Sequence, residues 1–283
     1  MSWLLSLPRR ILGTWQYAVA LGFAALFGFP LVWMVYSSFK APREIIRTVW
    51  ALPTTISLNG YNAVFSSSPF ATYFTNSMIM VVVSVPILTI AASLAAYAFA
   101  RANIRGLTLL FYLFLGGITI PIHVTLIPIF ILMRDLDLLN KLFSMVLPFV
   151  GFGLPVSIFI LRGFFEQIPI ELEEAARVDG CSTPYIFWRI AMPLAKPALV
   201  TVMILNVVAA WNEYLFALTL VGGNNAAYTM PIGIFSFTTT LGQTLYDKLF
   251  AGLTVTTLPV LIIYFLAQRQ IIKSLTAGAL AGT

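Results

Sequence analysis

The chain has 283 residues, of which 60% are hydrophobic and only 9% are charged, and its mean hydropathy is +0.94. Soluble domains carry about 25% charged residues, so the composition excludes an ordinary soluble fold and predicts an all-α membrane protein. The formal net charge of +6 comes from residues scattered singly along the polar stretches, and without a basic stripe we expect no nucleic-acid partner.

A single cysteine, Cys181, and a single histidine, His123, limit the chemistry further. One cysteine cannot form an internal disulfide, and the two residues do not make a cluster with the spacing of metal ligands. We therefore expect neither redox chemistry nor a bound metal.

Apolar stretches of spanning length recur along the chain. The first follows Arg9 and Arg10, and its 21 residues would cover about 31 Å as a helix, enough to cross the bilayer hydrocarbon. It is longer than the core of a signal peptide and has no small-residue cleavage site, so we predict a retained span. The six predicted spans of one membrane domain, 1–283, are residues 16–36, 76–100, 107–132, 143–161, 198–221 and 249–267.

The stretches between and within these spans carry further signals. Residues 37–73 are polar and broken by prolines, and Trp50 and Tyr61 suit an interfacial or docking surface, so a folded external loop is expected. The third span contains Pro121 and Pro128, where a helix must be distorted.

The basic residues predict the orientation in the membrane. Six spans put both termini on one side, together with Arg9, Arg10, Arg101, Arg105, Arg162, Arg177, Arg189, Lys196, Arg269 and Lys273. The other side has Lys40, Arg43, Arg47, Arg134, Lys141 and Lys248. The positive-inside rule then predicts that both termini are cytoplasmic, although Lys40, Arg43 and Arg47 lie close to the end of a span on the far side.

A polar segment, residues 168–197, separates the fourth span from the fifth. Pro169 suits a first helical turn, acidic residues follow where the helix dipole favours them, and Gly180 is a good left-handed terminator. A second helix is predicted to begin with Ser182 as N-cap and to end before Pro193. Two short helices joined at a glycine form an elbow, and we call residues 168–197 the polar elbow.

The polar elbow has the pattern EAA, three residues, G, nine residues, I, one residue, MP, which begins at Glu174 and ends at Pro193. This pattern resembles the EAA loop of binding-protein-dependent ABC importer permeases, with Met192 where that family usually has Leu. Other stretches resemble landmarks of the family's six-span, maltose-type sugar permeases: YAFAR at 97–101, LRGFF at 161–165, EEAARVDG at 173–180, WNEYL at 211–215 and LTAGA at 275–279. The tail departs from the pattern, with Ala281 where Lys is frequent.

The resemblance implies the type I ABC importer permease fold in a bacterial inner (cytoplasmic) membrane, with the polar elbow as a cytoplasmic loop on an ATPase. It implies as partners a second permease subunit, two ATP-binding subunits and an extracytoplasmic solute-binding protein. The residues to which it gives the ATPase-coupling role are Glu173, Glu174, Ala175, Ala176, Asp179, Gly180, Ile190 and Pro193.

No lysine of this chain follows a glycine, so the phosphate loop G-x-x-x-x-G-K-[ST] is absent. We expect the chain to bind no cofactor and to have no catalytic residue. ATP and Mg²⁺ are expected in the partner ATPase subunits.

Polar groups inside spans are costly and mark transport pathways. Glu213 is the one acid well inside a predicted span, and the aromatic and amide groups around it suit sugar rings and hydroxyls. The predicted substrate pathway comprises Asn76, Trp211, Asn212, Glu213 and Tyr214. Two alternatives stay open: Glu213 at the outer interface as packing or a gate, and His123 either lining a cavity or bonded to backbone carbonyls near Pro121.

The sequence thus predicts the permease subunit of an ATP-driven importer for a carbohydrate or sugar derivative. Residues 222–240 resemble the external loop that meets the solute-binding protein in maltose-type permeases. The alternative is an ion-coupled secondary carrier, which would need coupling acids in several spans, whereas this sequence has one. A membrane enzyme would need a nucleophile with a base beside it, and no such pair is recognisable.

Overall fold

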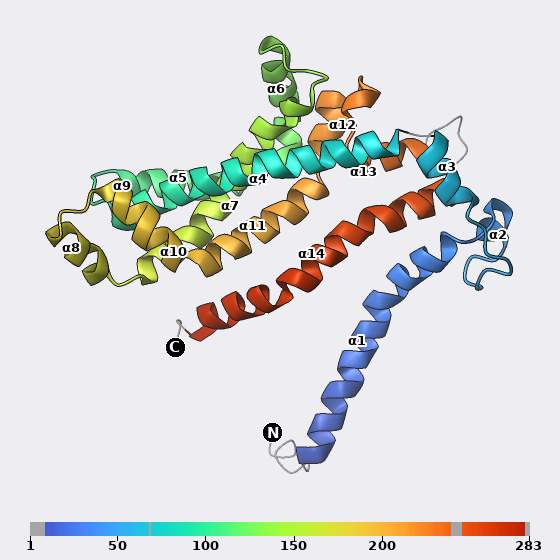
Figure 1. Cartoon of the computed structure of the whole chain (residues 1–283), viewed down its shortest axis with the longest axis horizontal. Coiled ribbons are helices and arrows are strands. Elements are labelled where there is room, and N and C mark those ends of the chain that lie inside the picture. Colours follow the sequence, from blue (N-terminus) through green and yellow to red (C-terminus); the bar gives the residue numbers. More distant parts are fainter. Residues whose placement is uncertain (1–8, 68, 239–244, 281–283) are drawn as a thin grey trace. The chain divides into compact units, whose positions relative to one another are not determined.

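The computed structural model describes residues 9–67, 69–238 and 245–280, and every regular element in these ranges is a helix (Figure 1). Contacts within the chain divide it into two compact units. The first comprises Met1–Ser68 and Ile234–Thr257, and the second comprises Pro69–Gly233 and Leu258–Thr283. The single domain expected for the whole chain stays a prediction.

In the first unit, the shorter elements lie around the C-terminal end of the longest helix, α1 (Arg9–Ser37). The described elements of this unit are α1, α2 (Pro42–Arg47), α3 (Asn59–Ser67), η5 (Ser236–Thr238) and the start of α14 (Tyr246–Leu280). Lys40 is buried between α1 and α2, and its Nζ donates to the carbonyls of Thr48 (2.8 Å) and Val49 (3.0 Å). These bonds satisfy a buried cation without a carboxylate, and they fold the segment after α1 into the ordered loop that the sequence predicts.

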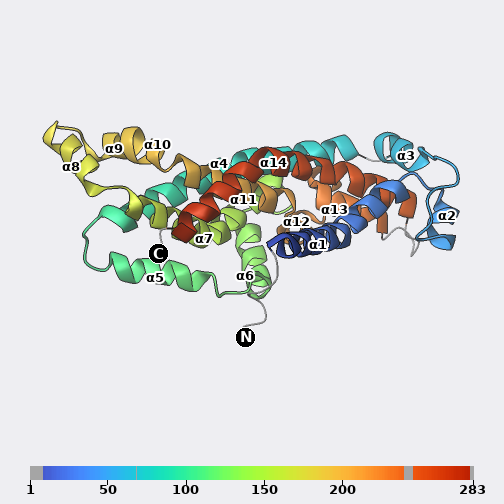
Figure 2. The same ribbon diagram turned by 90° about the horizontal axis from the view of Figure 1, so that it is seen from below.

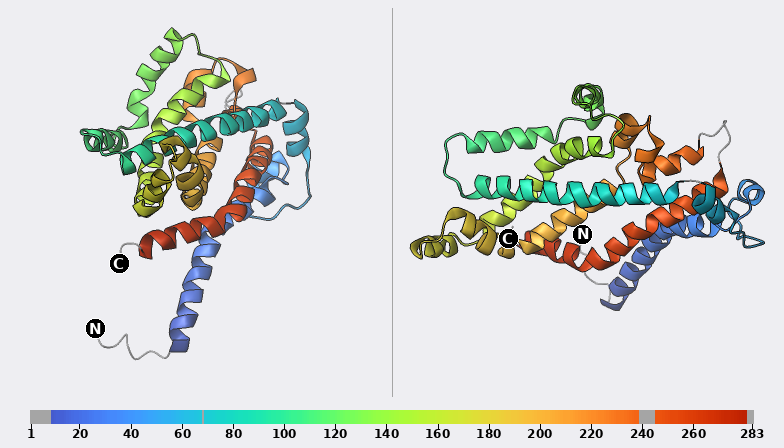
Figure 3. Two further views of the ribbon diagram at one scale, coloured as in Figure 1. Left: turned by 60° about the vertical axis from the view of Figure 1, so that its left-hand side comes forward. Right: turned by 45° about the horizontal axis from the view of Figure 1, so that its top comes forward.

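In the second unit, α4 (Phe70–Arg101), α7 (Val146–Gln167) and α11 (Lys196–Trp211) pack against one another, as the views in Figures 1 and 3 show. Small buried residues of α4, among them Ser84, Ala92, Ser93 and Ala96, let the neighbouring backbones approach closely. The remaining elements are α5 (Leu107–Gly117), α6 (Ile122–Asp135), η2 (Leu142–Met145), α8 (Ile170–Val178), α9 (Thr183–Ile186), η3 (Phe187–Ala191), α10 (Met192–Leu194), α12 (Leu215–Val221), η4 (Asn225–Ala227) and α13 (Met230–Phe235), the last of which reaches the boundary of the unit.

Among the described residues, four helices are long and apolar enough to cross a membrane, and the number rises to six if each of two bent helix pairs is one span. These pairs are Leu107–Gly117 with Ile122–Asp135 and Thr183–Leu194 with Lys196–Trp211. The four are Trp15–Ser37, Phe70–Arg101, Leu142–Gln167 and Tyr246–Gln268. They match the first, second, fourth and sixth predicted spans, with α14 continuing well beyond residue 267.

The third predicted span is strongly bent. Its halves, α5 and α6, meet at 101°, and α6 turns sharply away from α5 in both views of Figure 3. Pro121 stands in extended conformation just before α6 (φ −64°, ψ 126°). Because proline has no N–H to continue a helical ladder, the break predicted at this residue is a change of direction rather than a mild kink.

The fifth predicted span, 198–221, is not one helix: α11 ends at Trp211 and α12 starts at Leu215. The carboxylate of Glu213 accepts hydrogen bonds from the backbone N–H groups of Phe216 (2.7 Å) and Ala217 (3.0 Å). A side chain therefore takes the place of the helical carbonyls for these donors and starts a new helix, which hydropathy alone does not reveal.

Candidate functional site

The polar elbow lies at one end of the helices packed in the second unit, where α8, α9 and α10 extend beyond them (Figure 2). Helix α8 ends as predicted at Gly180, whose φ is +81°. The backbone N–H of Gly180 donates to Arg177 O (3.0 Å) and that of Cys181 donates to Ala176 O (2.9 Å). This pair of bonds is the Schellman motif, which needs a left-handed residue at the position of Gly180.

The second arm of the polar elbow differs from its prediction. Ser182 has the extended backbone of an N-cap, but its side chain makes no capping hydrogen bond, and the helical conformation continues past Pro193 to Leu194. A π-helical turn, η3, precedes this proline, and the Met192 N–H reaches back to Phe187 O. The wider turn relieves the clash between a proline ring and the preceding carbonyls, so the helix does not end there.

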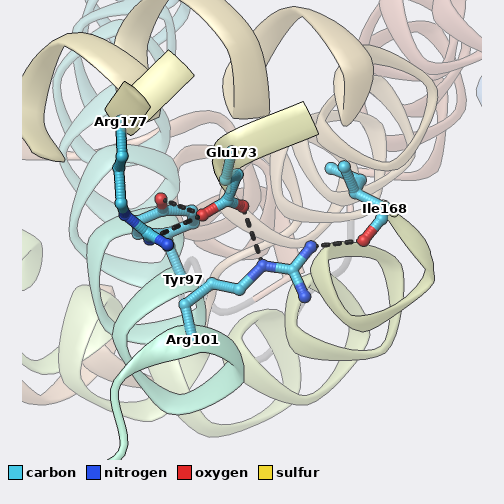
Figure 4. A network of polar contacts seen from close by, with 5 residues as sticks. All are labelled: Tyr97, Arg101, Ile168, Glu173 and Arg177. Carbon is cyan, nitrogen blue, oxygen red and sulfur yellow. Dashed lines mark hydrogen bonds and ion pairs between the residues drawn. The ribbon is translucent and has the colours of Figure 1, made fainter. Parts of the chain in front are cut away.

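Glu173 is the centre of a buried polar network that joins the polar elbow to α4 (Figure 4). Its Oε1 accepts from Arg101 Nε (2.8 Å), and its Oε2 accepts from the Tyr97 hydroxyl (2.8 Å) and from Arg177 (3.3 Å). Arg101 also donates to the carbonyl of Ile168, just before α8. The side chains of Arg101 and Glu173 are only 11% and 1% exposed, so this pair is shielded from solvent and anchors α8 to the C-terminal end of α4.

Aromatic packing holds the α4 side of this network in place. The ring of Tyr97 lies 5.5 Å from that of Phe165 on α7 and 5.1 Å from that of Phe187 in η3. Four segments, α4, α7, α8 and η3, therefore meet around one carboxylate. A displacement of α8 is resisted directly by its bonds to α4, whose Tyr97 is in turn held by the rings on α7 and η3.

The structure sorts the predicted coupling residues into two faces of the polar elbow. Glu173 and Ala176 are buried within the chain, and Ile190 is half-buried. Glu174, Ala175, Asp179, Gly180 and Pro193 are exposed. Val178, which carries no predicted role, is 88% exposed and shares the outer face of α8. The outer face is thus acidic at its edges with a small residue, Ala175, between the exposed apolar Leu172 and Val178.

The predicted pathway residues occupy different environments. Asn76 is buried, and its amide donates to the carbonyls of Ala226 (2.8 Å) and Tyr228 (2.9 Å), so it fixes the loop after α12. Trp211 is buried, with its ring 5.5 Å from that of Phe74. The remaining three, Asn212, Glu213 and Tyr214, form the turn between α11 and α12.

Within the second unit, Glu213 faces a cavity of about 230 Å³. Asn206, on α11, shares the cavity with Glu213, and its amide donates to Ser157 Oγ (3.1 Å) and to Val202 O (2.9 Å). These bonds use the donors of the amide, and the carbonyl oxygen of Asn206 is an acceptor beside the aromatic rings of the cavity. The aromatic lining residues are Phe149, Phe152 and Phe216.

Other residues singled out in the sequence lie elsewhere. His123 is exposed at the start of α6, and Cys181 is a free, half-buried thiol. The described part of loop 222–240 is ordered by Asn224, whose amide donates to Asn140 O (2.9 Å). Residues 239 and 240 of that loop and Ala281 lie outside the described residues.

Tyr97, Arg101 and Asn206 are the site residues that sequence reasoning missed. Tyr97 and Arg101 lie four residues apart and therefore share a helix face, and a buried basic residue needs an acidic partner. That signal indicates that Arg101 has an acidic partner, but it does not identify which acidic residue is the partner. Asn206 is a lone amide in the apolar run of α11, which is itself a signal of an intramembrane polar contact.

Residues 60–276 match the family described as binding-protein-dependent transport system inner membrane component. The chain is 41% identical over 254 residues to the "Putative ABC transporter permease protein ORF2" of Caldicellulosiruptor sp. (strain Rt8B.4), covering 89% of this chain and 91% of the relative. It is 32% identical to the "Arabinooligosaccharides transport system permease protein AraQ" of Halalkalibacterium halodurans, over 95% of this chain and 97% of the relative. Its fold matches a chain in a crystal structure of a bacterial ABC transporter involved in the import of the acidic polysaccharide alginate, with a TM-score of 0.77, 26% identity and coverage of 92% and 96% of the two chains.

Proposed function

The chain belongs to the family of binding-protein-dependent transport system inner membrane components, and from this premise we propose that it is the permease subunit of an ATP-driven importer of a carbohydrate or sugar derivative. It is a multi-pass protein of the inner membrane. Both termini and the polar elbow are proposed to face the cytoplasm, which is the side with more lysine and arginine residues. The ion-coupled carrier is the weaker alternative, because one relative is named as an ABC transporter permease and the matching crystal structure is of an ABC transporter involved in import.

The observation that carries the proposed mechanism is the buried attachment of α8 through Glu173. A separate ATPase, which holds ATP and Mg²⁺, docks on the exposed face of α8 around Glu174 and Ala175. When the ATPase pair closes, α8 moves, and the Glu173 network passes the displacement to α4. Packed helices transmit such shifts as rigid bodies, so the spans change between inward-open and outward-open states.

The partners follow from the same proposal. Each permease chain has one docking helix, α8. Two ATP-binding subunits therefore need two such helices, and the second helix belongs to a second, similar permease subunit. The family name supports a solute-binding protein on the other side of the membrane, and loop 222–240 is the proposed contact for it.

Docking on the outer face is tested by replacing Ala175 with Trp, because a large ring on an exposed small residue blocks close approach. The matched control is Ala102→Trp, since Ala102 is also exposed and follows α4 on the same proposed side of the membrane. We expect Ala175→Trp to abolish co-purification of the ATPase subunits and the control to retain it. Equal co-purification of both variants would place the docking surface elsewhere.

The substrate class rests on the cavity of Asn206 and Glu213. Its carbonyl and carboxylate oxygens accept hydrogen bonds from hydroxyls, and its phenylalanine rings offer apolar surface for the faces of sugar rings. Asn206→Ala should lower sugar uptake into proteoliposomes while the ATPase subunits stay bound. Thr201→Ala is the control on the same helix, because among the described residues the Thr201 hydroxyl bonds only to a carbonyl of its own helix (Pro197 O, 3.0 Å). Uptake that is unchanged in Asn206→Ala, or driven by a proton gradient without ATP, contradicts this assignment.

A further inference from the structure

A polar hollow of about 340 Å³ opens beside α2 in the first unit, away from every residue given a role above. Its polar lining consists of Arg43, Glu44, Arg47, Thr48, Thr54 and Thr55. Arg43 and Arg47 are four residues apart on α2, so their side chains share one face. Both are exposed, and within the described part of the chain neither has an ion-pair or hydrogen-bond partner.

The acidic member of the hollow does not neutralise these arginines by contact. The Oε1 atom of Glu44 accepts the backbone N–H of Thr54 (2.7 Å), which joins α2 to the loop that closes the hollow. Glu44 thus shapes the site. The Thr48 hydroxyl donates to Glu44 O (3.0 Å). Among the described residues, the hollow keeps two guanidinium groups and the hydroxyls of Thr54 and Thr55 as free donors, a set suited to phosphate oxygens.

Aromatic contacts put the hollow at the depth of lipid headgroups. The candidate span ends at Ser37, and the ring of Trp50 lies 5.6 Å from Trp33 and 6.0 Å from Phe29 on α1. The Tyr36 hydroxyl also donates to Trp50 O (3.0 Å). Tryptophan and tyrosine collect at the membrane–water interface, so the loop that follows α2 lies against the membrane end of α1.

The same residues are the ones that fit the positive-inside rule least. Lys40, Arg43 and Arg47 are basic residues near a span on the side with fewer positive charges. The ammonium group of Lys40 is already hydrogen-bonded within the fold, to two backbone carbonyls. Within the part of the chain that the structure describes, no ion pair or hydrogen bond involves the guanidinium groups of Arg43 and Arg47.

We propose that Arg43 and Arg47 bind the phosphodiester of a phospholipid headgroup. Guanidinium groups match phosphate oxygens in a bidentate geometry and are less strongly hydrated than ammonium groups. The exposed apolar side chains of Ile46 (65%), Trp50 (69%) and Leu52 (70%) beside the hollow suit contact with the glycerol and acyl region. The lipid is the chosen occupant because Trp50 packs on Phe29 and Trp33 at the membrane end of α1, where headgroups are the neighbouring phosphates.

The test uses native mass spectrometry of the purified importer complex, stripped of lipid and titrated with phosphatidylglycerol. The variant Arg43→Gln/Arg47→Gln is compared with Arg134→Gln/Lys141→Gln, which removes two exposed basic residues from the end of α6 and the loop after it, on the same proposed side. We expect the first variant to bind one lipid about thirtyfold more weakly, which is ~2 kcal/mol at ~1 kcal/mol per basic residue near a lipid surface. The control should stay within about twofold of the original chain, since each of its basic residues is paired with an aspartate.

Two further arms identify the source of the phosphate. Glycerol 3-phosphate carries the same phosphate chemistry without acyl chains, and we expect it not to compete with the lipid. Effective competition would identify a soluble anion as the ligand and overturn the proposal. Unchanged lipid binding in Arg43→Gln/Arg47→Gln also overturns it, and so does a loss of affinity for the solute-binding protein while lipid binding is retained.

Discussion

The Glu173 network allows a quantitative prediction about how α8 is held. Replacing Glu173 by Ala removes the acceptor of Arg101 and of the Tyr97 hydroxyl in a site that is closed to solvent. Removing one partner of a buried ion pair typically costs ~3–5 kcal/mol, because the other charge remains buried. Since α8 has few other polar ties to the spans, we expect this cost to favour local detachment of α8 over global unfolding.

Hydrogen exchange of the α8 backbone amides in the purified importer measures this detachment. At ~1.4 kcal/mol per factor of ten, ~3–5 kcal/mol corresponds to exchange that is faster by about two to four orders of magnitude. Exchange of the amides of α7 in the same sample serves as an internal reference, because α7 does not depend on the carboxylate for its own helix.

Related variants should follow the strength of each contact. Tyr97→Phe removes one hydrogen bond to a charged acceptor and should cost ~1.5–3 kcal/mol, whereas its ring contacts remain. Arg177→Ala should cost under ~1 kcal/mol, because the Arg177 side chain is 45% exposed and its contact is long (3.3 Å). Glu171→Ala is the matched control, an exposed carboxylate on the same helix to which no docking role is given, and should change exchange by no more than about twofold. The reasoning is refuted if Glu173→Ala exchanges like the original chain, or if Glu171→Ala has an effect of the same size.

Three substitutions test other features of the fold by thermal unfolding in detergent. Gly180→Ala should destabilise by ~1 kcal/mol, because φ is +81° and a Cβ disfavours that conformation, whereas Gly163→Ala inside α7, with open space around it, should be neutral or stabilising. Asn76→Ala leaves two loop carbonyls without their donor and should cost ~1–3 kcal/mol; an unchanged melting temperature would contradict the anchoring role. Gly233→Ala puts a Cβ into the ring of Tyr73 and should cost ~1–3 kcal/mol, unlike Gly151→Ala, whose Cβ would enter open space beside α7.

The parts of this fold that the sequence predicts well depend on local rules. The apolar length of a span, the turn at Gly180 and the distortion at Pro121 each follow from a residue and its immediate neighbours. The polar elbow is therefore recognisable as two helices with a glycine between them. The continuation through Pro193 is not, because it depends on a π-helical turn that no propensity scale predicts.

The parts that the sequence does not predict depend on distant pairs. Glu173 bonds to residues 72 and 76 positions earlier in the chain, and nothing near Glu173 distinguishes it from the exposed Glu174. Similarly, Glu213 looks like an intramembrane charge in a hydropathy profile. Its bonds to the N–H groups at the start of α12 become visible only when the backbone is seen to turn.

The two faces of α8 explain how a short helix can transmit force. A helix of nine residues is marginal on its own, because isolated helices shorter than about 12–15 residues barely form in water. The buried face, with Glu173 and Ala176, ties α8 to the spans before any partner arrives. The exposed face around Glu174 and Ala175 is then already ordered, so an ATPase that docks there does not have to offset the entropy of folding the helix. Substitutions on the inner face should therefore weaken ATPase docking indirectly, through disorder of α8, and a second substitution that stabilises the helix should restore it, whereas no such rescue is expected for substitutions on the outer face.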